Sequence, residues 1–522
     1  MSLPVVLIGP ILRRVEPRSV AVFVATSLDA SVHLSLYEGV TDGANPGQEM
    51  AGVDTSTTRF GAQFHATVAT VTLAEPTTSP HGTDDTAGQL PLLPGHRYSY
   101  DLRITPVGGT ASTLSELGLL TDTTLPGYGA ATEDNPAGAG VEVCGVSYAD
   151  GQLPSFVTPP ERVEDLVLAH ASCRKPHGYG DPALQYLDDV IGSIDGADTG
   201  LEGAPAGRPH QLFLTGDQIY ADDVAAALAP GLTALGISLL SGDDTRAGPE
   251  EVPSPAGGTP LMVNTTVLPP GFRQRVLGLS GFTSELAGCH LVGFGEFLAM
   301  YCVAWNPHLW PVLAVADTAD HSLQSWPALK KRLDDDRAAS PPDAPVVLGR
   351  PTPDAATDVL TPLYGGTAIA TAALSGALDG FLADKQQLDG YRREVAKVRR
   401  ALANVPTYMI CDDHDVTDDW FMTGGIRRAT TASPCGRAVI RNALTAYVVC
   451  QAWGDDPHTW TTEADHQAVL GAIPEMFPSS WTGGLPEQPA TDTIDFTLGL
   501  AAGTDGLIDF SFTVDGPMHH VR

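Results

Sequence analysis

The segment His210-Gln-Leu-Phe-Leu-Thr215, followed by Gly216-Asp217-Gln218-Ile219-Tyr220, decides the fold that we expect for this chain. Its first part is a short apolar run typical of a buried strand, and its second part turns at a glycine into polar residues. The apolar runs at 165–171 and 406–411 share this pattern. A helical rhythm of apolar residues spans 378–402. Strands that alternate with helices predict an α/β domain.

The N-terminal part of the chain has a different sequence pattern. From about residue 5 to residue 124 it consists of short alternating segments bounded by Gly, Pro and Asp, which indicates an antiparallel β-sandwich. The segment 93–100 is similar to the turn and tyrosine-bearing strand of fibronectin type III domains. Residues 127–140 are rich in Gly and Ala and resemble a linker. We therefore expect a β-sandwich domain over 1–125, a linker or crossing segment over 126–160, and an α/β domain over 161–522 with an insertion at about 225–403.

Composition excludes several classes of protein. Lys and Arg number 29 against 62 Asp and Glu, and the resulting charge of −33 argues against a nucleic-acid packaging role. The seven cysteines are scattered without a C-x-x-C pair, so a disulfide scaffold is not expected. The N-terminus has no basic region before its apolar run, and the uncharged window 359–378 is interrupted by Pro and Gly. We expect a loop entering a buried helix there, no membrane span, and a cytoplasmic protein.

Polar side chains follow each of the three apolar runs. They are Ser172-Cys173-Arg174-Lys175-Pro176-His177 after the first, the segment 216–223 after the second, and 412–420 after the third. In open α/β sheets ligands bind beyond the carboxyl ends of the strands, so these three tips are expected to converge. Gathered carboxylates repel one another unless a cation compensates them. Thiolate, phenolate and carboxylate together suit a trivalent or borderline metal ion.

Each of these residues also has a purely structural interpretation. Asp217 is placed to act as the N-cap of a following helix. Cys173 alone fits a small buried hydrophobic residue. His414 fits a surface ion pair, and the acidic run 412–419 fits a solvated loop or a calcium-type loop. The joint occurrence of metal-compatible side chains at three strand tips, in chain order, favours the metal site.

The segments Ser172-Cys173, Gly216-Asp217-Gln218-Ile219-Tyr220 and Asp412-Asp413-His414-Asp415 resemble the signature of the alkaline phosphatase D (PhoD-like) metallophosphatases. This family is a branch of the calcineurin-like metallophosphoesterase superfamily. The resemblance extends to the layout and covers most of the chain. It implies a layered α/β/β/α domain preceded by an antiparallel β-sandwich of the fibronectin III or Ig-like kind.

The resemblance also implies roles for individual residues. Cys173, Asp217 and Tyr220 would bind an iron-type metal ion, and Asp217 would bridge to a second divalent ion, which is calcium in some relatives; zinc or manganese are the other expected ions. Asp413 stands where the superfamily's Gly-Asn-His-Asp/Glu element has its metal-binding Asn. His414 stands where that element has its catalytic His.

Arg174 follows the cysteine and is the candidate for binding a phosphate oxygen, with a salt bridge to a neighbouring Asp as the alternative. Lys175 and His177 are weaker candidates for the same role. One departure from the family concerns the C-terminal end. The superfamily adds His-bearing segments after a strand like that expected at 507–514, whereas this sequence stops at Arg522 after His519 and His520. We therefore expect the α/β domain to be C-terminally incomplete and its metal site to lack ligands.

The function that these features predict is metal-dependent hydrolysis of phosphoric esters, in which a hydroxide that bridges two metal ions attacks phosphorus in line. The expected substrate is a small phosphate ester. The alternatives are a phosphodiesterase or phospholipase D-like activity, and an inactive truncated scaffold that binds another protein. Organic cofactors are not expected, because the sequence has neither a Walker G-x-x-x-x-G-K nor a complete G-x-G-x-x-G motif.

Overall fold

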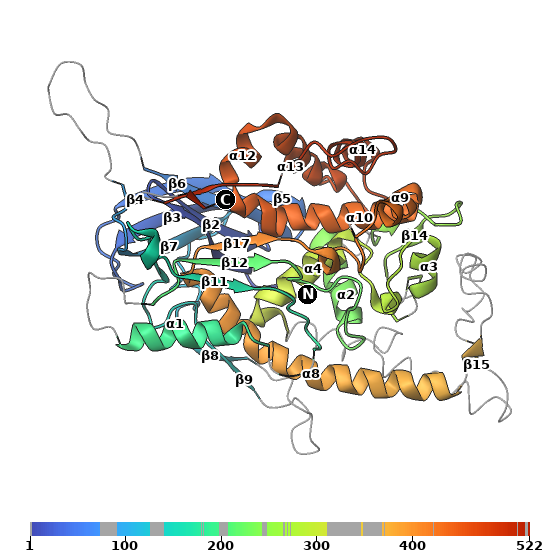
Figure 1. Cartoon of the computed structure of the whole chain (residues 1–522), viewed down its shortest axis with the longest axis horizontal. Helices are drawn as coiled ribbons and strands as arrows, with labels where there is room; N and C mark the ends of the chain where they lie inside the picture. Colours follow the sequence, from blue (N-terminus) through green and yellow to red (C-terminus); the bar gives the residue numbers. More distant parts are fainter. Residues whose placement is uncertain are drawn as a thin grey trace.

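Three sheets and the helices around them form a mixed α/β structure (Figure 1). The structure is a computed structural model. It describes residues 3–73, 91–125, 140–178, 180, 182–197, 207–242, 248–264, 267–268, 270–271, 273–310, 346–347, 368–369, 371–420, 422–508, 510–516 and 520–521. All structural statements below concern these residues.

Two four-stranded antiparallel sheets occupy the N-terminal part of the chain (Figure 1). The first has the order β1-β2-β6-β5, with β1 (Val6–Glu16), β2 (Ser19–Thr26), β6 (Phe64–Thr72) and β5 (Thr58–Gly61). The second has the order β10-β7-β3-β4, with β10 (Ser155–Val157), β7 (Arg97–Pro106), β3 (Ala30–Glu38) and β4 (Ala51–Ser56). β10 comes from the segment expected to cross between domains, and it pairs antiparallel with β7. The backbone N–H of Leu93 donates to the Tyr98 hydroxyl over 2.9 Å.

Strand β2 shows how the first sheet joins the rest of the molecule. Its side chains alternate, and both sets are buried. Val22 and Val24 lie in the hydrophobic core that the two antiparallel sheets share. Phe23 and Ala25 lie in the larger core formed with the parallel sheet and the helices. The first sheet is therefore a layer common to two cores, since a strand buried on both faces has no solvent side.

A three-stranded parallel sheet carries the polar strand tips. Its order is β11-β12-β17, with β11 (Leu168–Ala171), β12 (Gln211–Thr215) and β17 (Thr407–Ile410). Ala171 is the register partner of Leu214, and Thr215 is that of Ile410. The three strands therefore end at the same edge, as the apolar runs predicted. β12 and β17 are largely buried, as expected of parallel strands covered on both faces, whereas β11 is partly exposed, so the expectation of a buried strand at 165–171 is wrong.

Helices cover this sheet and form the remainder of the larger core (Figure 1). The long helix α8 confirms the helical rhythm expected at 378–402, and its residues Tyr391, Val395, Val398 and Leu402 are buried. The helix expected near 437–453 is α10 continued by a π-helical turn over Val448–Ala452 and by α11. The helices are α1 (Gln185–Ala197), α2 (Ala229–Ser241), α3 (Gln274–Leu279), α4 (Phe294–Trp305), α8 (Thr371–Asn404), α9 (Gly424–Ala432), α10 (Pro434–Tyr447), α11 (Trp453–Asp455), α12 (Pro457–Thr462), α13 (Ala464–Met476) and α14 (Gln488–Thr497).

Short two-stranded ladders complete the described secondary structure. They are β8 (Thr123–Leu125) with β9 (Val141–Val143), β13 (Glu251–Val252) with β14 (Leu261–Met262), β15 (Val346–Val347) with β16 (Ala368–Ile369), and β18 (Val514–Asp515) with β19 (His520–Val521). None of the helices in the described ranges combines the length and the apolar character that crossing a membrane requires.

The prediction of a strand over 507–514 is wrong for most of that segment. Among its described residues only Val514 is in a strand, in the two-residue β18. Instead of extending a sheet, Phe510 contacts the ring of Tyr447, and Phe512 stacks on Tyr408 of β17 with 5.5 Å between ring centroids. Aromatic contacts hold this segment against β17. Of the window 359–378, residues 359–367 and 370 lie outside the described residues, and α8 begins at Thr371.

Candidate metal centre

The turn that follows β12 depends on Gly216. Its φ of +116° lies in a region that side chains rarely adopt, and a Cβ at this position would stand 2.3 Å from the Cβ of Asp412. A glycine is therefore needed for the second and third strand tips to approach each other. Cys173 (φ 58°) and Asp217 (φ 52°) also have positive φ, and Asp419 is the one other described non-glycine residue that does. Backbone strain of this kind is concentrated at functional sites.

Backbone hydrogen bonds tie the three strand tips together. The N–H of Cys173 donates to the Gly216 carbonyl over 3.3 Å, and the N–H of Arg174 donates to the Asp217 carbonyl over 2.9 Å. The third tip is tied to the second by Asp415, whose Oδ2 accepts from the N–H of Asp217 over 2.7 Å and from that of Asp412 over 3.1 Å. The positions of the tips are thus held by main-chain hydrogen bonds and by the Asp415 carboxylate.

Asp415 has a structural role that the sequence analysis did not assign. It is buried, and burial raises its pKa to about 7. The local signal for this role was available, because Asp412 and Asp415 have the spacing of a capping box, in which each side chain bonds to the other's backbone N–H. What the spacing could not show is the bond to Asp217, which comes from a different strand tip.

Three of the expected site residues form a cluster of donor atoms. One atom each from Asp217, Asp413 and His414 lies within 4.8 Å of the others. Asp217 is buried, and its Oδ1 has no hydrogen-bond partner. Burial also raises the pKa of this carboxyl group. A buried oxygen without a partner, beside a second carboxylate and an imidazole, fits a metal-ion ligand set.

The remaining two expected metal ligands flank Asp217. The Tyr220 hydroxyl donates to Oδ2 of Asp217 over 3.3 Å. The Cys173 thiol interacts with the side chains of both Asp217 and Tyr220, although Cys173 itself is exposed. Burial and then the nearby Asp217 charge raise the pKa of the Tyr220 phenol. A phenol in these surroundings stays protonated unless a metal ion binds it, so the proposed ligand role requires the ion itself.

Asp222 orients the imidazole of His414. Its Oδ1 lies 2.8 Å from Nδ1 of His414, and its Oδ2 accepts from the Ser284 hydroxyl over 2.8 Å. The His414 ring also stacks on Tyr220, with 4.6 Å between ring centroids. The hydrogen bond to Asp222 is the main cause that raises the pKa of His414 to about 9. The sequence analysis missed Asp222, because nothing in the acidic segment 216–223 distinguishes it from Asp223.

Arg174 forms the salt bridge that the sequence left open as the alternative, with Glu394 in place of a neighbouring Asp. The side chain is buried, and its Nε lies 2.6 Å from Oε1 of Glu394. Its Nη1 donates to the Ala304 carbonyl over 2.7 Å, and the guanidinium lies 4.5 Å from the ring centroid of Tyr391. These contacts engage the guanidinium in the protein interior, and a phosphate-binding role for Arg174 stays a prediction.

Lys175 and His177 share one partner beside the cluster. The ammonium of Lys175 forms an ion pair with Asp223, and Nε2 of His177 lies 3.2 Å from Oδ1 of the same carboxylate. The ammonium also lies 6.0 Å from the ring centroid of Tyr220. The Lys175 ammonium therefore lies near Tyr220, and its ion-pair partner is Asp223 rather than Asp217 or Asp413.

Comparisons with known proteins give little additional information. No protein-family model matches the chain, and no curated protein matches it in sequence. A solved structure described as "Structure of PhoD" is similar over 86% of this chain and 46% of that chain, with 10% identity and a TM-score of 0.32. The catalytic module of the glycogen-degrading pneumococcal virulence factor SpuA is similar over 42% of this chain and 30% of that chain, with 13% identity and a TM-score of 0.13. Both similarities are too weak to assign a fold or a function, and this chain spans less than half of the PhoD chain.

Proposed function

We propose that the chain is a metal-dependent hydrolase of phosphoric esters of the PhoD-like kind. The observation that supports this most directly is the approach of Asp217, Asp413 and His414 to within 4.8 Å, from two different strand tips. The residues belong to the segments that resemble the PhoD-like signature, which independently predicted that they would meet. The net charge of −33 does not oppose binding of an anionic ester, because bound metal ions dominate the field within such a site.

The proposed roles follow from the contacts. Asp217 and Asp413, with Cys173 and Tyr220, would hold the metal ions, and the Asp217 carboxylate would be shared between them. When bound, the ions supply an activated water and neutralise charge on the phosphoryl oxygens. In the metal-free chain the hydrogen bond with Asp222 raises the pKa of His414 to about 9. With Nδ1 engaged by Asp222, its Nε2 is left to donate a hydrogen bond or a proton to the ester oxygen that departs.

The identity and number of the metal ions belong to the same proposal. The expected content is two or more ions, either iron with calcium or other divalent ions such as zinc or manganese. The mixed set of thiolate, phenolate and carboxylate favours iron or zinc over calcium at the ligands around Asp217. A carboxylate ligand such as Asp413 suits calcium, which prefers oxygen ligands.

We also propose a division of the chain that matches this function. Residues 1–125 form a β-sandwich domain of the fibronectin III or Ig-like kind, 126–160 form the crossing segment, and 161–522 form a layered α/β/β/α catalytic domain with its insertion at about 225–403. The strand orders β1-β2-β6-β5 and β10-β7-β3-β4, with one core between them, support the sandwich. The parallel order β11-β12-β17, with all tips at one edge, supports the catalytic domain.

Hydrolysis assays test the function. The chain is supplied with iron, zinc, manganese or calcium and assayed on p-nitrophenyl phosphate and on bis(p-nitrophenyl) phosphate. Asp217→Ala should reduce hydrolysis to background, because it removes the proposed bridge. The matched control is Asp492→Ala, an exposed carboxylate on α14, which should retain wild-type turnover.

Each outcome of these assays has a definite meaning. Wild-type turnover in Asp217→Ala would contradict the proposed site. Absence of hydrolysis by the wild-type chain with every metal ion would contradict the function and favour the scaffold. The ratio of the hydrolysis rates on p-nitrophenyl phosphate and on bis(p-nitrophenyl) phosphate decides between the monoesterase and the phosphodiesterase alternatives.

A further inference from the structure

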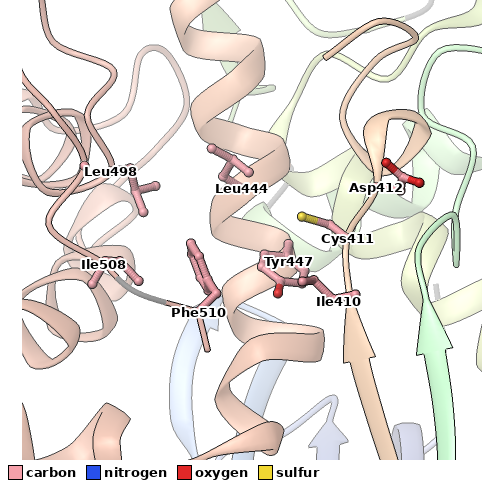
Figure 2. Close-up of a pocket in the computed structure, with 9 residues that line it drawn as sticks. Ile410, Cys411, Asp412, Leu444, Tyr447, Leu498, Ile508 and Phe510 are labelled. Atoms are coloured by element: carbon pink, nitrogen blue, oxygen red, sulfur yellow. The ribbon is translucent and has the colours of Figure 1, made fainter. Parts of the chain in front are cut away.

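An apolar pocket lies beside the candidate metal centre. Its volume is about 280 Å³. The end of β17 forms one wall, α10 forms the back, and the segment after α14 forms the opposite wall (Figure 2). The lining side chains used below are Ile410, Asp412, Leu444, Tyr447, Ile508 and Phe510.

The lining of this pocket is chemically uniform. Apart from Asp412 and the Tyr447 hydroxyl, the described residues that line it offer hydrocarbon, aromatic ring, thiol or glycine surface. No Lys or Arg is among them. The wall formed by Phe510 is supported by a ring contact with Tyr447 at 5.4 Å between centroids. A pocket of this composition binds an uncharged hydrocarbon group better than a phosphate or a sugar, because its walls offer few groups that could replace water hydrogen bonds.

Asp412 connects the pocket to the cluster. It lines the pocket, and its Oδ1 accepts a hydrogen bond from the backbone N–H of Asp413 over 2.9 Å. Asp413 is the next residue in the chain and contributes a donor atom to the cluster. Since consecutive Cα atoms are about 3.8 Å apart, residues of the pocket and of the cluster adjoin in this turn. Figure 2 shows Asp412 beyond Cys411, where β17 leads into that turn, with Ile508 and Phe510 across the pocket.

The exposed surface of Ile410 indicates that the pocket is open to a ligand. Ile410 is the last residue of β17 and is 45% exposed, whereas Leu444 is buried behind the pocket. Protein interiors are close-packed, and unfilled apolar volume costs stability unless it serves a purpose. A dry apolar cavity of roughly 150 Å³ already accepts benzene. The volume here therefore accommodates an aromatic ring or a short alkyl chain.

We propose that this pocket binds the hydrocarbon part of the substrate, so that the substrate is a phosphoric ester of an aryl alcohol or a short alkyl alcohol. The inference rests on the proposed function and makes its substrate class more specific. The phosphoryl group lies at the Asp217–Asp413–His414 cluster, and the ester oxygen points past Asp412 toward Ile508. The carboxylate of Asp412 at the rim disfavours esters with a second anionic group at this end.

Binding of non-hydrolysable phosphonates tests this assignment. Methylphosphonate, hexylphosphonate and phenylphosphonate are titrated into the full chain with manganese by isothermal titration calorimetry. The wild-type chain should bind the hexyl and phenyl compounds at least about tenfold more tightly than the methyl compound, since roughly two buried methylene groups supply that factor. Ile508→Trp fills the pocket and should reduce this ratio to about one.

Leu507→Trp is the matched control. Leu507 is the neighbouring residue and 46% exposed, and it is not among the described lining residues, so the preference for the longer chain should persist in this variant. Equal binding of methyl- and hexylphosphonate by the wild-type chain would overturn the pocket assignment even if Ile508→Trp failed to fold. An undiminished preference in a folded Ile508→Trp variant would overturn it as well. Failure of all three compounds to bind would instead contradict the proposed function on which it rests.

Discussion

Buried carboxylates in this chain have two kinds of surroundings. Around the core helices they pair with arginines: Glu296 lies 2.7 Å from Arg273, and Asp455 lies 2.6 Å from Arg13. At the strand tips, no described Lys or Arg forms an ion pair with Asp217, Asp412, Asp413 or Asp415. The contrast matters most for Asp217 and Asp415, which are buried as Glu296 and Asp455 are and therefore also carry a desolvation cost.

The difference indicates what each region serves. Arg273 and Arg13 neutralise the buried carboxylates of Glu296 and Asp455. At the strand tips the partner is lacking, and Oδ1 of Asp217 is left without a hydrogen bond. A fixed cation at this point would occupy the position of the proposed metal ions. We therefore infer that the strand tips retain negative charge beyond what the His414 imidazolium compensates, at a cost in the stability of the metal-free protein.

Breaking an arginine pair should have the largest effect on stability. Arg273 is buried, and it also donates to the carbonyls of Leu268 and His290. Arg273→Met leaves Glu296 buried without its partner and should lower the free energy of unfolding by about 3–5 kcal/mol, measured by urea denaturation. Replacing both residues by Met should recover most of this loss. A loss below about 1 kcal/mol in the single variant would contradict the role assigned to the pair.

Glu250 extends the comparison of buried carboxyl groups, because its oxygens accept hydrogen bonds from backbone N–H groups. Its oxygens accept from the N–H groups of Phe294 and Gly295 at the start of α4, and from Asn442. Burial raises its pKa from 4.5 to about 8. Between these values the folded chain holds a proton that the unfolded chain has released, so stability decreases as the pH rises and levels off above pH 8.

The measurement is the free energy of unfolding from pH 5 to pH 9. In wild type the free energy of unfolding should decrease over this pH range by on the order of a few kcal/mol, since a tenfold change in proton affinity corresponds to about 1.4 kcal/mol. Glu250→Gln should remove this decrease. Glu251→Gln, at the partly exposed neighbouring residue, should retain the slope. If the free energy of unfolding changed with pH equally in wild type and Glu250→Gln, this carboxyl group would not be the source of the pH dependence.

At the strand tips, Tyr220 should contribute less than Asp217 to metal binding. Tyr220→Phe removes the hydroxyl that contacts Asp217 and keeps the ring that stacks on His414. We expect metal affinity to fall about tenfold, measured by competition with a chelator of known affinity. Tyr186→Phe, on an exposed tyrosine of α1, should leave it unchanged. Unchanged affinity in Tyr220→Phe would exclude the phenol from the ligand set.

The smallest expected change in the free energy of unfolding has the opposite sign from the change expected for Arg273→Met. Burial raises the pKa of Asp217, so the ionised carboxylate is disfavoured in the metal-free fold. Asp217→Asn removes that charge and should increase the free energy of unfolding in EDTA by about 0.5–1 kcal/mol. A decrease of that size would mean that Asp217 supports the fold by itself, and the contrast between the two regions would then fail.

Much of the scaffold of the site could be predicted from sequence, for a local reason. The apolar runs before Gly216 and Asp412 define β12 and β17 to within a residue, and parallel strands bring their carboxyl ends to one edge. The approach of Asp217 to Asp413 follows from that rule. The antiparallel strands of the N-terminal part were predictable for the same reason, because alternation within single strands is a local signal.

The partners could not be predicted where they lie far apart in the chain. Glu394, which pairs with Arg174, is 220 residues away on α8, and no local pattern marks it. Asp222 is one of several acids in a short segment, and only the folded geometry selects it for His414. The segment 507–514 shows the reverse error, because a strand-like pattern was overridden by aromatic contacts of Phe510 and Phe512.

The most direct measurement is the metal content of the purified chain. Wild type and Asp217→Ala are incubated with iron, zinc, manganese and calcium, freed of unbound ions, and measured by inductively coupled plasma mass spectrometry. We predict at least one bound ion per wild-type chain and almost complete loss in Asp217→Ala. A wild-type chain that retains no ion, or an Asp217→Ala variant that retains as much as wild type, would contradict the claim that the strand tips form a metal centre.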